Sequence, residues 1–371
     1  MRIGFDAKRA FFNRSGLGNY SRNLIESLIH YHPENDYYLY SPKENGRINF
    51  IAEKSYELRT PDRKLHKISP SLWRSKFISK QINNDKLDLF HGLSGEIPLT
   101  SKNRVTKSVV TIHDLIYMRY PELYSPIDRK IYFQKARYAC KNSNLVIAIS
   151  EQTKIDIINF TGINESKIKV VYQDCDRSFY KEASQDEKIL LQKRFSLPSS
   201  YLLYVGTIEK RKNLLTLVKA LHNSGEDIPL VVIGRKTGYY KEVANYITDN
   251  RIKNIIFPEN IPSADLPAIY QMATAFIYPS FFEGFGIPII EALISGIPVI
   301  TSIGGCFPEA GGPSTIYINP EDSDELSEAI KRILHDSSLR KKMSEKGLAY
   351  ARRFASENIV KDYIEAYRSV I

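Results

Sequence analysis

The sequence predicts an α/β protein built from two doubly wound, Rossmann-like domains. Short apolar runs alternate with amphipathic stretches along most of the chain, as expected of parallel sheets that are covered by helices on both faces. This alternation occurs twice, before and after a polar, charged stretch at residues 181–194. A length of 371 residues is too great for one ordinary hydrophobic core and fits two domains.

The first domain is predicted at residues 1–180. Apolar runs typical of buried strands occur at residues 3–6, 37–40, 88–91, 109–113, 145–149 and 169–172. Apolar residues at helical spacing predict helices at residues 18–30, 71–82, 126–141 and 151–160. Because ligands of open α/β sheets bind beyond the carboxyl ends of the strands, a site is expected in the loops that follow these runs.

The second domain is predicted at residues 181–354, and its first residues, up to Pro198, are interpreted as a connection. Strands are predicted at residues 201–206, 230–234, 255–257, 275–278 and 299–301. Helices are predicted at residues 214–222, 239–247, 264–272 and 287–294. The tail, at about residues 355–371, has the spacing of an amphipathic helix, with apolar Ile359, Val360, Tyr363, Ile364 and Tyr367 on one face.

The composition is that of an ordinary globular protein, with 25% charged and 43% hydrophobic residues. No apolar run approaches the roughly 18–20 residues that span a bilayer, and no signal-peptide core precedes the first strand. Cys140, Cys175 and Cys306 lie far apart without metal-ligand spacing, which argues against a disulfide framework or a zinc site. These observations predict a cytoplasmic protein.

The net charge of +10 is concentrated in one part of the chain. Residues 54–141 contain 18 Lys and Arg against 8 Asp and Glu, a difference equal to the whole net charge. A basic domain beside a neutral one favours an anionic partner, such as a membrane surface or a lipid pyrophosphate. The sequence has no nucleic-acid-binding motif, so nucleic acid is not an expected partner.

Residues 279–302 hold the most informative local pattern. A Gly-Phe-Gly turn at residues 284–286 follows an apolar strand and precedes a helix that begins near Ile287. Backbone N–H groups and the helix dipole at such an N-terminus form an anion site. Glu283 lies in the turn, and Glu291 lies about a turn deeper on the same face. Because carboxylates beside a phosphate are suited to accept hydrogen bonds from sugar hydroxyls, the pattern suggests a nucleotide-linked sugar.

This segment resembles the Glu-x7-Glu signature of the retaining GT-B glycosyltransferases of family 4. Other segments resemble motifs of that family in the same order, namely Gly16-Leu-Gly18-Asn-Tyr20, Thr111-Ile-His113-Asp114, Ile149-Ser150, residues 204–213, residues 266–280 and Pro308-Glu309-Ala-Gly311. The resemblance covers essentially the whole chain. It implies two domains that face a central cleft, a last helix that returns to the first domain, and retaining transfer of a sugar from a nucleotide diphosphate to a glycan or lipid-linked acceptor.

The resemblance implies roles for the second domain's turn and helix. Glu283 is the first catalytic candidate, in contact with the donor sugar, and its replacement by Ala is expected to abolish transfer and leave the fold intact. Glu291 is expected to bind the nucleotide ribose, although a glutamate at this position could also cap or pair within its own helix. Phe285, Gly286 and Ile287 are expected to donate backbone N–H groups to phosphate or sugar.

Arg211 and Lys212 follow the strand at residues 201–206, where a basic turn in an arbitrary sequence would be a solvated surface feature. The resemblance implies that Lys212 binds the donor diphosphate. Arg211 is then a substitute for an arginine that the family often has where this chain has Thr207. The nucleotide base is expected near residues 234–235 and 260–261.

In the first domain, Gly16 and Gly18 either bring the backbone close to a donor phosphate or sugar, or form an ordinary turn between strand and helix. Their spacing does not fit the dinucleotide-binding fingerprint. His113 ends an apolar strand, where a histidine is commonly a polar terminus. The resemblance implies that it touches the donor sugar near its reacting face, which makes it the second catalytic candidate; Asp114 is expected to shape the turn.

The Asp174-Cys175-Asp176 segment has two interpretations. It follows an apolar run, so its carboxylates could hold a divalent cation across a diphosphate. It also resembles the family's domain junction, in which Asp176 and Phe179 match while Gln173 and Asp174 depart from the pattern. We favour the junction, and expect neither a metal nor another cofactor.

The sequence therefore predicts a retaining, metal-independent glycosyltransferase. GDP-mannose is the first donor to test, because residues 205–213 resemble mannosyltransferases of bacterial surface polysaccharide assembly. Two alternatives stay open: a GT-B nucleotide-sugar epimerase, which needs no acceptor, and a non-catalytic protein that binds sugar nucleotides.

The predicted helix at residues 71–82 carries Trp73 and Phe77 four residues apart, beside Arg74, Lys76 and Lys80. More basic residues precede it, at 63, 64 and 67. Such a helix either lies in an anionic headgroup layer or packs its aromatic side chains into its own domain. The charge excess favours the first alternative and predicts peripheral association with the inner face of the cytoplasmic membrane.

Overall fold

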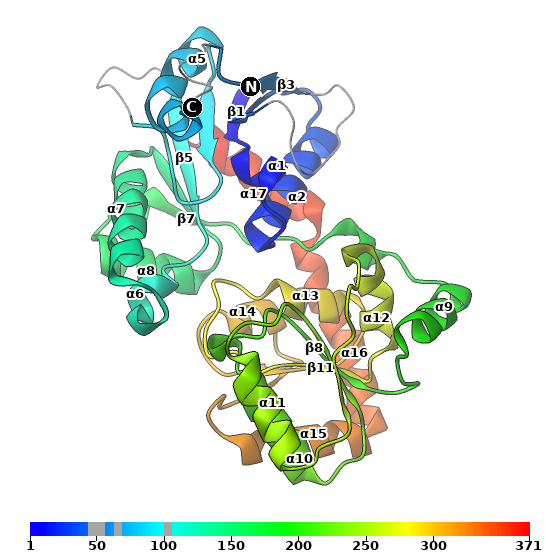
Figure 1. The fold of residues 1–371 in the computed structure, drawn as a ribbon. Helices are drawn as coiled ribbons and strands as arrows, with labels where there is room; N and C mark the ends of the chain where they lie inside the picture. The colour runs from blue at the N-terminus through cyan, green and yellow to red at the C-terminus, as the bar shows by residue number, and fades with distance from the viewer. Residues whose placement is uncertain (44–55, 63–68, 100–105) are drawn as a thin grey trace. The chain divides into compact units, whose positions relative to one another are not determined.

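The structure, a computed structural model, describes residues 1–43, 56–62, 69–99 and 106–371 (Figure 1). The chain divides into two compact units. The first comprises Met1–Asp174 and Ala355–Ile371, and the second comprises Cys175–Phe354. Each unit contains one sheet in which every described strand pairing is parallel. The predicted α/β class is confirmed.

The sheet of the first unit has the order β3-β2-β1-β4-β5-β6-β7. Its strands are β1 (Arg2–Asp6), β2 (Asp36–Tyr40), β3 (Glu57–Arg59), β4 (Leu89–Gly92), β5 (Lys107–Ile112), β6 (Leu145–Ala148) and β7 (Ile168–Val170). The strand order changes direction between β1 and β4, so the loops that follow these two strands diverge there. This is the position at which open α/β sheets bind ligands.

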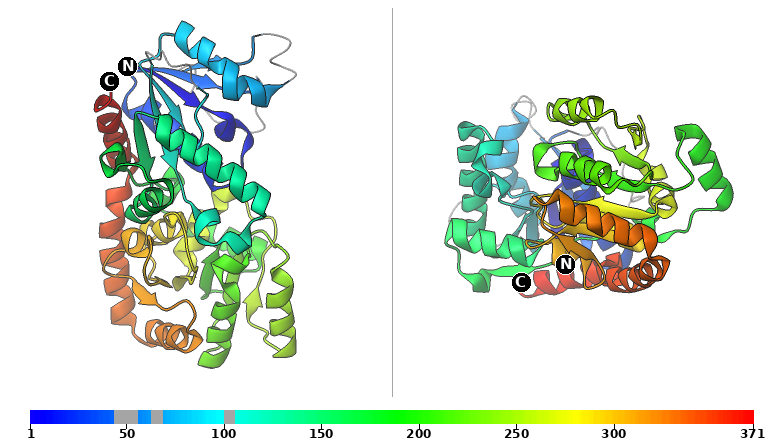
Figure 2. Two further views of the ribbon diagram at one scale, coloured as in Figure 1. Left: turned by 90° about the vertical axis from the view of Figure 1, so that its left-hand side faces the viewer. Right: turned by 90° about the horizontal axis from the view of Figure 1, so that it is seen from below.

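Helices cover both faces of this sheet. They are α1 (Lys8–Phe12), α2 (Gly16–Tyr31), α4 (Pro70–Leu72), the π-helical η1 (Trp73–Phe77), α5 (Ile78–Asn84), α6 (Ile116–Arg119), η2 (Pro121–Leu123), α7 (Pro126–Asn142), α8 (Glu151–Thr161), η3 (Glu165–Lys167) and α17 (Ser356–Arg368). Successive strand residues point to opposite faces. Val109 packs in a core with α2 and α17, while Val110 packs in another core with α7, which crosses the sheet (Figure 2).

The first unit ends at Asp174, earlier than the boundary expected at residue 180. Asp174 accepts a hydrogen bond from Ser356 Oγ of α17 at 2.6 Å, which ties it to the first unit. Phe179, in the 3-10 helix η4 (Arg177–Tyr180), packs instead on Tyr270 of the second unit, with ring centroids 5.4 Å apart. The chain therefore changes units within the Asp-Cys-Asp segment.

The sheet of the second unit has the order β10-β9-β8-β11-β12-β13. Its strands are β8 (Leu202–Val205), β9 (Leu230–Ile233), β10 (Ile255–Ile256), β11 (Ala275–Tyr278), β12 (Val299–Ser302) and β13 (Ile316–Ile318). Its helices include α9 (Gln185–Phe195), η5 (Lys210–Lys212), α10 (Leu214–Ser224), α11 (Tyr240–Asp249), η6 (Ser263–Asp265), α12 (Leu266–Met272), α13 (Ile287–Ile294), α14 (Phe307–Gly311), α15 (Ser323–His335), α16 (Ser337–Ala351) and η7 (Arg352–Phe354). The switch in strand order falls between β8 and β11, where Arg211 and Glu283 follow the strands.

Most of residues 181–194, the stretch interpreted as a connection, forms α9, a helix that was not predicted from the sequence. The Ser184 side chain caps the helix by accepting from the Glu187 N–H at 3.2 Å. Acidic residues in the first turn and basic residues in the last suit the helix dipole. Leu191 is the one α9 residue that is fully buried, so little apolar periodicity marks the helix in the sequence.

The helix expected at a membrane surface packs into its own unit instead. Trp73 is 1% exposed and donates from Nε1 to Gln81 Oε1 at 3.1 Å. Phe77 packs against the same cluster, and Arg74 pairs with Asp6. Residues 63, 64 and 67 lie outside the described residues. Of the helices in the described part of the chain, none is long and apolar enough to cross a membrane.

Candidate active site

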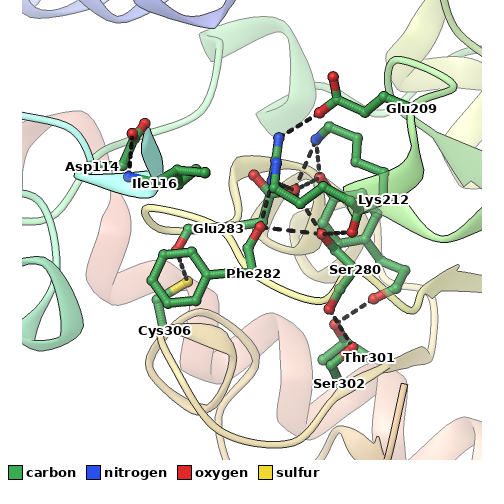
Figure 3. A network of polar contacts seen from close by, with 12 residues as sticks. Asp114, Ile116, Glu209, Lys212, Ser280, Phe282, Glu283, Thr301, Ser302 and Cys306 are labelled. Atoms are coloured by element: carbon green, nitrogen blue, oxygen red, sulfur yellow. Dashed lines mark hydrogen bonds and ion pairs between the residues drawn. The ribbon is translucent and has the colours of Figure 1, made fainter. Parts of the chain in front are cut away.

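The turn that follows β11 brings Glu283 to Arg211 and Lys212 (Figure 3). Glu283 Oε1 lies 2.9 Å from Lys212 Nζ and 2.7 Å from Arg211 Nη1. The hydroxyls of Tyr278 and Ser280 donate to the same oxygen at 2.8 and 2.9 Å. The structure thus joins three predicted site residues that belong to two separate sequence motifs.

The two cations determine the charge state of this carboxylate. Burial acts to raise the pKa of Glu283, but Lys212 and Arg211 lower it to about 2. The three side chains are each only 13% or 14% exposed, so solvent screens their attraction weakly. Glu283 is therefore ionised at neutral pH. It is suited to accept hydrogen bonds, and cannot serve as a general acid in this state.

Asn213 fixes the basic turn relative to β11, although it was not among the predicted site residues. It ends η5 with a left-handed backbone (φ +58°), a conformation that asparagine tolerates better than most residues. Its Nδ2 donates to the carbonyls of Pro279 and Pro320 at 3.1 and 2.7 Å. The side chain therefore holds Arg211 and Lys212 beside the strand end that carries Glu283.

The start of α13 is suited to bind an anion. Gly286 precedes the helix with φ +122°, a backbone conformation that few other residues adopt. The Gly286 and Ile287 amides lie at the N-terminal end of this helix, where helix geometry directs them outward, and no side-chain hydrogen bond caps the helix. The ring of Phe285 packs on Phe354 at 5.5 Å and is 2% exposed, so its side chain belongs to the core and only its backbone is suited to a ligand.

Glu291 lies on α13 and accepts a hydrogen bond from Tyr270 Oη at 3.0 Å. This partner belongs to α12, so the contact does not support pairing within the residue's own helix. Burial raises the pKa of Glu291 to about 7, against the effect of the Tyr270 hydrogen bond and with a further contribution from the negative charge of Asp176. Near neutral pH the group is therefore divided between its protonated and ionised forms.

A pocket of about 370 Å³ lies beyond the ends of β9 and β10. Its lining includes residues 233–236 and 257–261, which contain both segments at which the sequence placed the nucleotide base. Lys236 pairs with Glu259 at 3.1 Å and lies 4.8 Å above the Tyr240 ring. The pocket combines an aromatic side chain, Phe257, with backbone polar groups, a combination that suits a flat heterocycle.

In the first unit, His113 follows β5 with both ring nitrogens engaged. Its Nε2 lies 2.9 Å from the Leu93 carbonyl oxygen and donates to it, while Nδ1 accepts from Gln173 Nε2 at 3.0 Å. Burial lowers the pKa of His113 to about 4 despite the bond to Leu93. The imidazole is neutral, with no nitrogen left for proton transfer in this arrangement. Gln173, which in the sequence is only a departure from the family pattern, orients it.

Neighbouring residues in this unit have structural partners. Asp114 accepts from the Ile116 N–H at 3.1 Å and so shapes the turn (Figure 3). A Cβ atom on Gly18 would lie 1.8 Å from the Asn13 carbonyl oxygen, whereas one on Gly16 would meet nothing within 4 Å. Packing of the turn before α2 therefore explains the glycine at 18. The backbone at Gly16 leaves space for a ligand.

The Asp174-Cys175-Asp176 carboxylates also have protein partners. Asp174 accepts from Ser356, and Asp176 caps η4 by accepting from the Ser178 N–H at 2.8 Å. Cys175, between them in the sequence, is buried. Within the described ranges, no group of three or more His, Cys, Asp or Glu side chains is placed to hold a metal ion. The segment thus has the geometry of a junction.

Comparison with known proteins agrees with the fold. Residues 14–176 match the family described as Glycosyltransferase Family 4, and residues 185–350 match Glycosyl transferases group 1. The structure of HepE from Anabaena in complex with UDP and glucose superposes with a TM-score of 0.74 at 20% identity, over the full length of both chains. The family matches and the fold therefore define a glycosyltransferase of the GT-B type.

Two of the similar proteins are O-antigen mannosyltransferases. The O-antigen chain mannosyltransferase B of Escherichia coli is 31% identical over 287 residues, which cover 76% of this chain and 74% of that protein. The O-antigen chain mannosyltransferase RfbU of Salmonella typhimurium is 28% identical over 226 residues, 60% of each chain. This chain belongs to glycosyltransferase family 4.

Proposed function

We propose that this glycosyltransferase moves a mannosyl residue from GDP-mannose to a growing surface polysaccharide, with retention of configuration and without a metal ion. The cluster of Glu283, Arg211 and Lys212 beside the start of α13 carries the proposal, because it combines fixed cations with an ionised carboxylate. The similarity to two O-antigen mannosyltransferases supports the choice of donor and pathway.

In the proposed reaction, Lys212, Arg211 and the amides of Gly286 and Ile287 stabilise the departing diphosphate. Glu283 accepts hydrogen bonds from the donor sugar, and Glu291 accepts from the ribose. The acceptor oxygen forms a bond to the anomeric carbon as the bond to the diphosphate oxygen breaks. The proton of the acceptor hydroxyl passes to that departing oxygen on the same face, so the chemistry depends on positioning and needs no strong protein base.

The donor is tested first by thermal shift with a panel of nucleoside diphosphates and their sugars. A ligand that binds only the folded state raises the melting temperature, so GDP-mannose should give a larger shift than UDP-glucose at equal concentration. The reverse order would reject the proposed donor.

Incubation with GDP-mannose and an acceptor glycan, followed by NMR of the product, tests the reaction. An α-linked mannoside from this α-linked donor supports retention, whereas a β-linkage refutes it. Free sugar or an epimer formed without acceptor would indicate the epimerase, and binding without turnover would indicate a non-catalytic protein.

We also propose that α7, in place of residues 71–82, contacts an anionic membrane. Ile127 and Ile131 lie four residues apart on this helix and are 73% and 43% exposed, with Lys130 and Arg137 also exposed on it. Insertion of the apolar residues and attraction of the cations would give reversible binding. Co-sedimentation with anionic vesicles should be lost in Ile127→Glu/Ile131→Glu. Equal sedimentation of variant and wild type would refute this surface.

A further inference from the structure

A large pocket in the first unit has no role in the proposed donor site. It has a volume of about 590 Å³ and lies beyond the carboxyl end of β1. One part of its lining is cationic, with Lys8, Arg9, Arg74 and Lys135. Four cations against two carboxylates make this pocket positive, which points to an anionic ligand.

Ion pairs neutralise only part of this charge. Arg74 bridges the two carboxylates of the pocket, with Nε 2.7 Å from Asp6 Oδ2 and Nη1 2.9 Å from Glu96 Oε2. Lys135 Nζ lies 3.2 Å from the other oxygen of Glu96. Asp6 is thus paired with Arg74, and Glu96 is paired with Arg74 and Lys135. Neither carboxylate forms an ion pair with the other two cations of the lining.

The remaining cations are Lys8 and Arg9, neighbours on α1. Neither forms an ion pair with any described residue, and both are half-buried. Burial, followed by the charges of Arg74 and Arg9, lowers the pKa of Lys8, and the charges of Asp6 and Glu96 offset this lowering only in part. An arginine and a lysine side by side match a phosphate, which carries up to two negative charges and several acceptor oxygens.

Apolar side chains form another part of the lining. Leu99 is 50% exposed, Ile131 43% and Tyr132 45%, so the cations adjoin apolar surface that water now contacts. A free phosphate would leave this surface unused. A phosphate attached to a hydrocarbon chain or a sugar ring would cover it and gain the corresponding burial energy.

A second pocket of about 300 Å³ in the same unit adjoins this one. The two share Arg9, Glu96, Tyr132 and Lys135, and the second is also lined by His113. A molecule held by a phosphate at Lys8 and Arg9 could therefore extend along the shared lining toward the end of β5.

We propose that this pocket binds the acceptor through a phosphate group, held by Lys8 and Arg9, while Leu99, Ile131 and Tyr132 cover the part attached to the phosphate. Naming the ligand as the acceptor rests on the proposed function. The phosphate site itself does not, because it is defined by charge and shape in the first unit alone.

The test measures binding by calorimetry, without donor, for farnesyl diphosphate, inorganic pyrophosphate and mannose 1-phosphate. Lys8→Ala/Arg9→Ala should weaken binding of the phosphate probes by roughly tenfold or more, because charge-assisted hydrogen bonds are lost. Lys361→Ala/Arg368→Ala removes the same charge from exposed positions of α17 in the same unit, outside both pockets, and should leave the affinities near those of wild type. Binding of GDP to the Lys8/Arg9 variant, measured in parallel, should be unchanged.

Farnesyl diphosphate binding more tightly than the other two probes would support a lipid-linked phosphate. Mannose 1-phosphate binding as tightly would support the same site with a soluble phosphorylated acceptor. The phosphate site is overturned if wild type binds none of the probes, or if both double variants lose affinity equally. GDP binding is measured separately from binding of the phosphate probes. A wrong donor assignment would therefore appear in the GDP measurement, and a wrong phosphate site would appear in the comparison of wild type with the Lys8/Arg9 variant.

Discussion

Replacement of Glu283 tests whether one carboxylate organises the candidate active site. Its Oε1 contacts Lys212, Arg211, Tyr278 and Ser280, and the two cations lower its pKa from the ordinary 4.5 to about 2. At about 1.36 kcal/mol per pKa unit, this change of about 2.5 units favours the ionised form by about 3 kcal/mol. A neutral glutamine of the same shape should lose a stabilisation of that order.

Alanine should be more harmful than glutamine. It removes the acceptor altogether and leaves Arg211 and Lys212 largely buried without their shared anion, a loss that typically costs about 3–5 kcal/mol. The structure therefore revises the expectation that Glu283→Ala leaves the fold intact. The glutamine variant is the better test of catalysis, because it keeps the volume and an acceptor oxygen.

The assay is urea denaturation of wild type and Glu283→Gln at several pH values, together with turnover at pH 7. Because the folded-state pKa of Glu283 is depressed, its stabilisation is present above pH 4.5 and is lost as the pH falls toward 2. The stability difference should therefore be about 3 kcal/mol at pH 7 and shrink below pH 4.5. A glutamine variant as stable as wild type at pH 7, or with normal turnover, would refute the reasoning.

Other predictions concern the remaining residues. Because the folded state raises the pKa of Glu291, ionisation of this carboxyl lowers the stability of the folded protein as the pH rises from 4.5 to 7. In urea denaturation at pH 8, Glu291→Gln should therefore be up to about 3 kcal/mol more stable than wild type, and it should bind nucleotide more weakly. Lys212→Ala should weaken GDP binding by about 1.5–3 kcal/mol in calorimetry, and unchanged affinity would reject its role. Gln173→Ala should lower turnover and alter the imidazole NMR signals of His113 while GDP affinity holds. Transfer should persist in excess EDTA and in Asp174→Asn; loss on chelation, with recovery on adding manganese, would revive the metal site.

The sequence by itself determined the fold class, because strands buried on both faces leave short apolar runs and the helices between them leave a periodic apolar face. Elements with little buried apolar surface leave a weaker pattern, which sufficed to predict β7 and β10 but not every such element. The helix α9 and the edge strands β3 and β13 were not predicted, and β3 has no fully buried residue while β13 has only one. For α9, the cap at Ser184 and the charges at its two ends were the available signal.

For the site, the sequence predicted Glu283, Arg211 and Lys212 through the resemblance to family 4, together with their positions after predicted strands. It did not reveal that the two cations bind the carboxylate itself, since Lys212 and Glu283 are 71 residues apart in the chain and follow different strands, β8 and β11. The position of Trp73 likewise became clear only from the packing of the folded chain. A tryptophan beside lysines gives the same sequence pattern in a membrane-binding helix and in a helix that packs into a core. Only the packing around the tryptophan distinguishes the two cases.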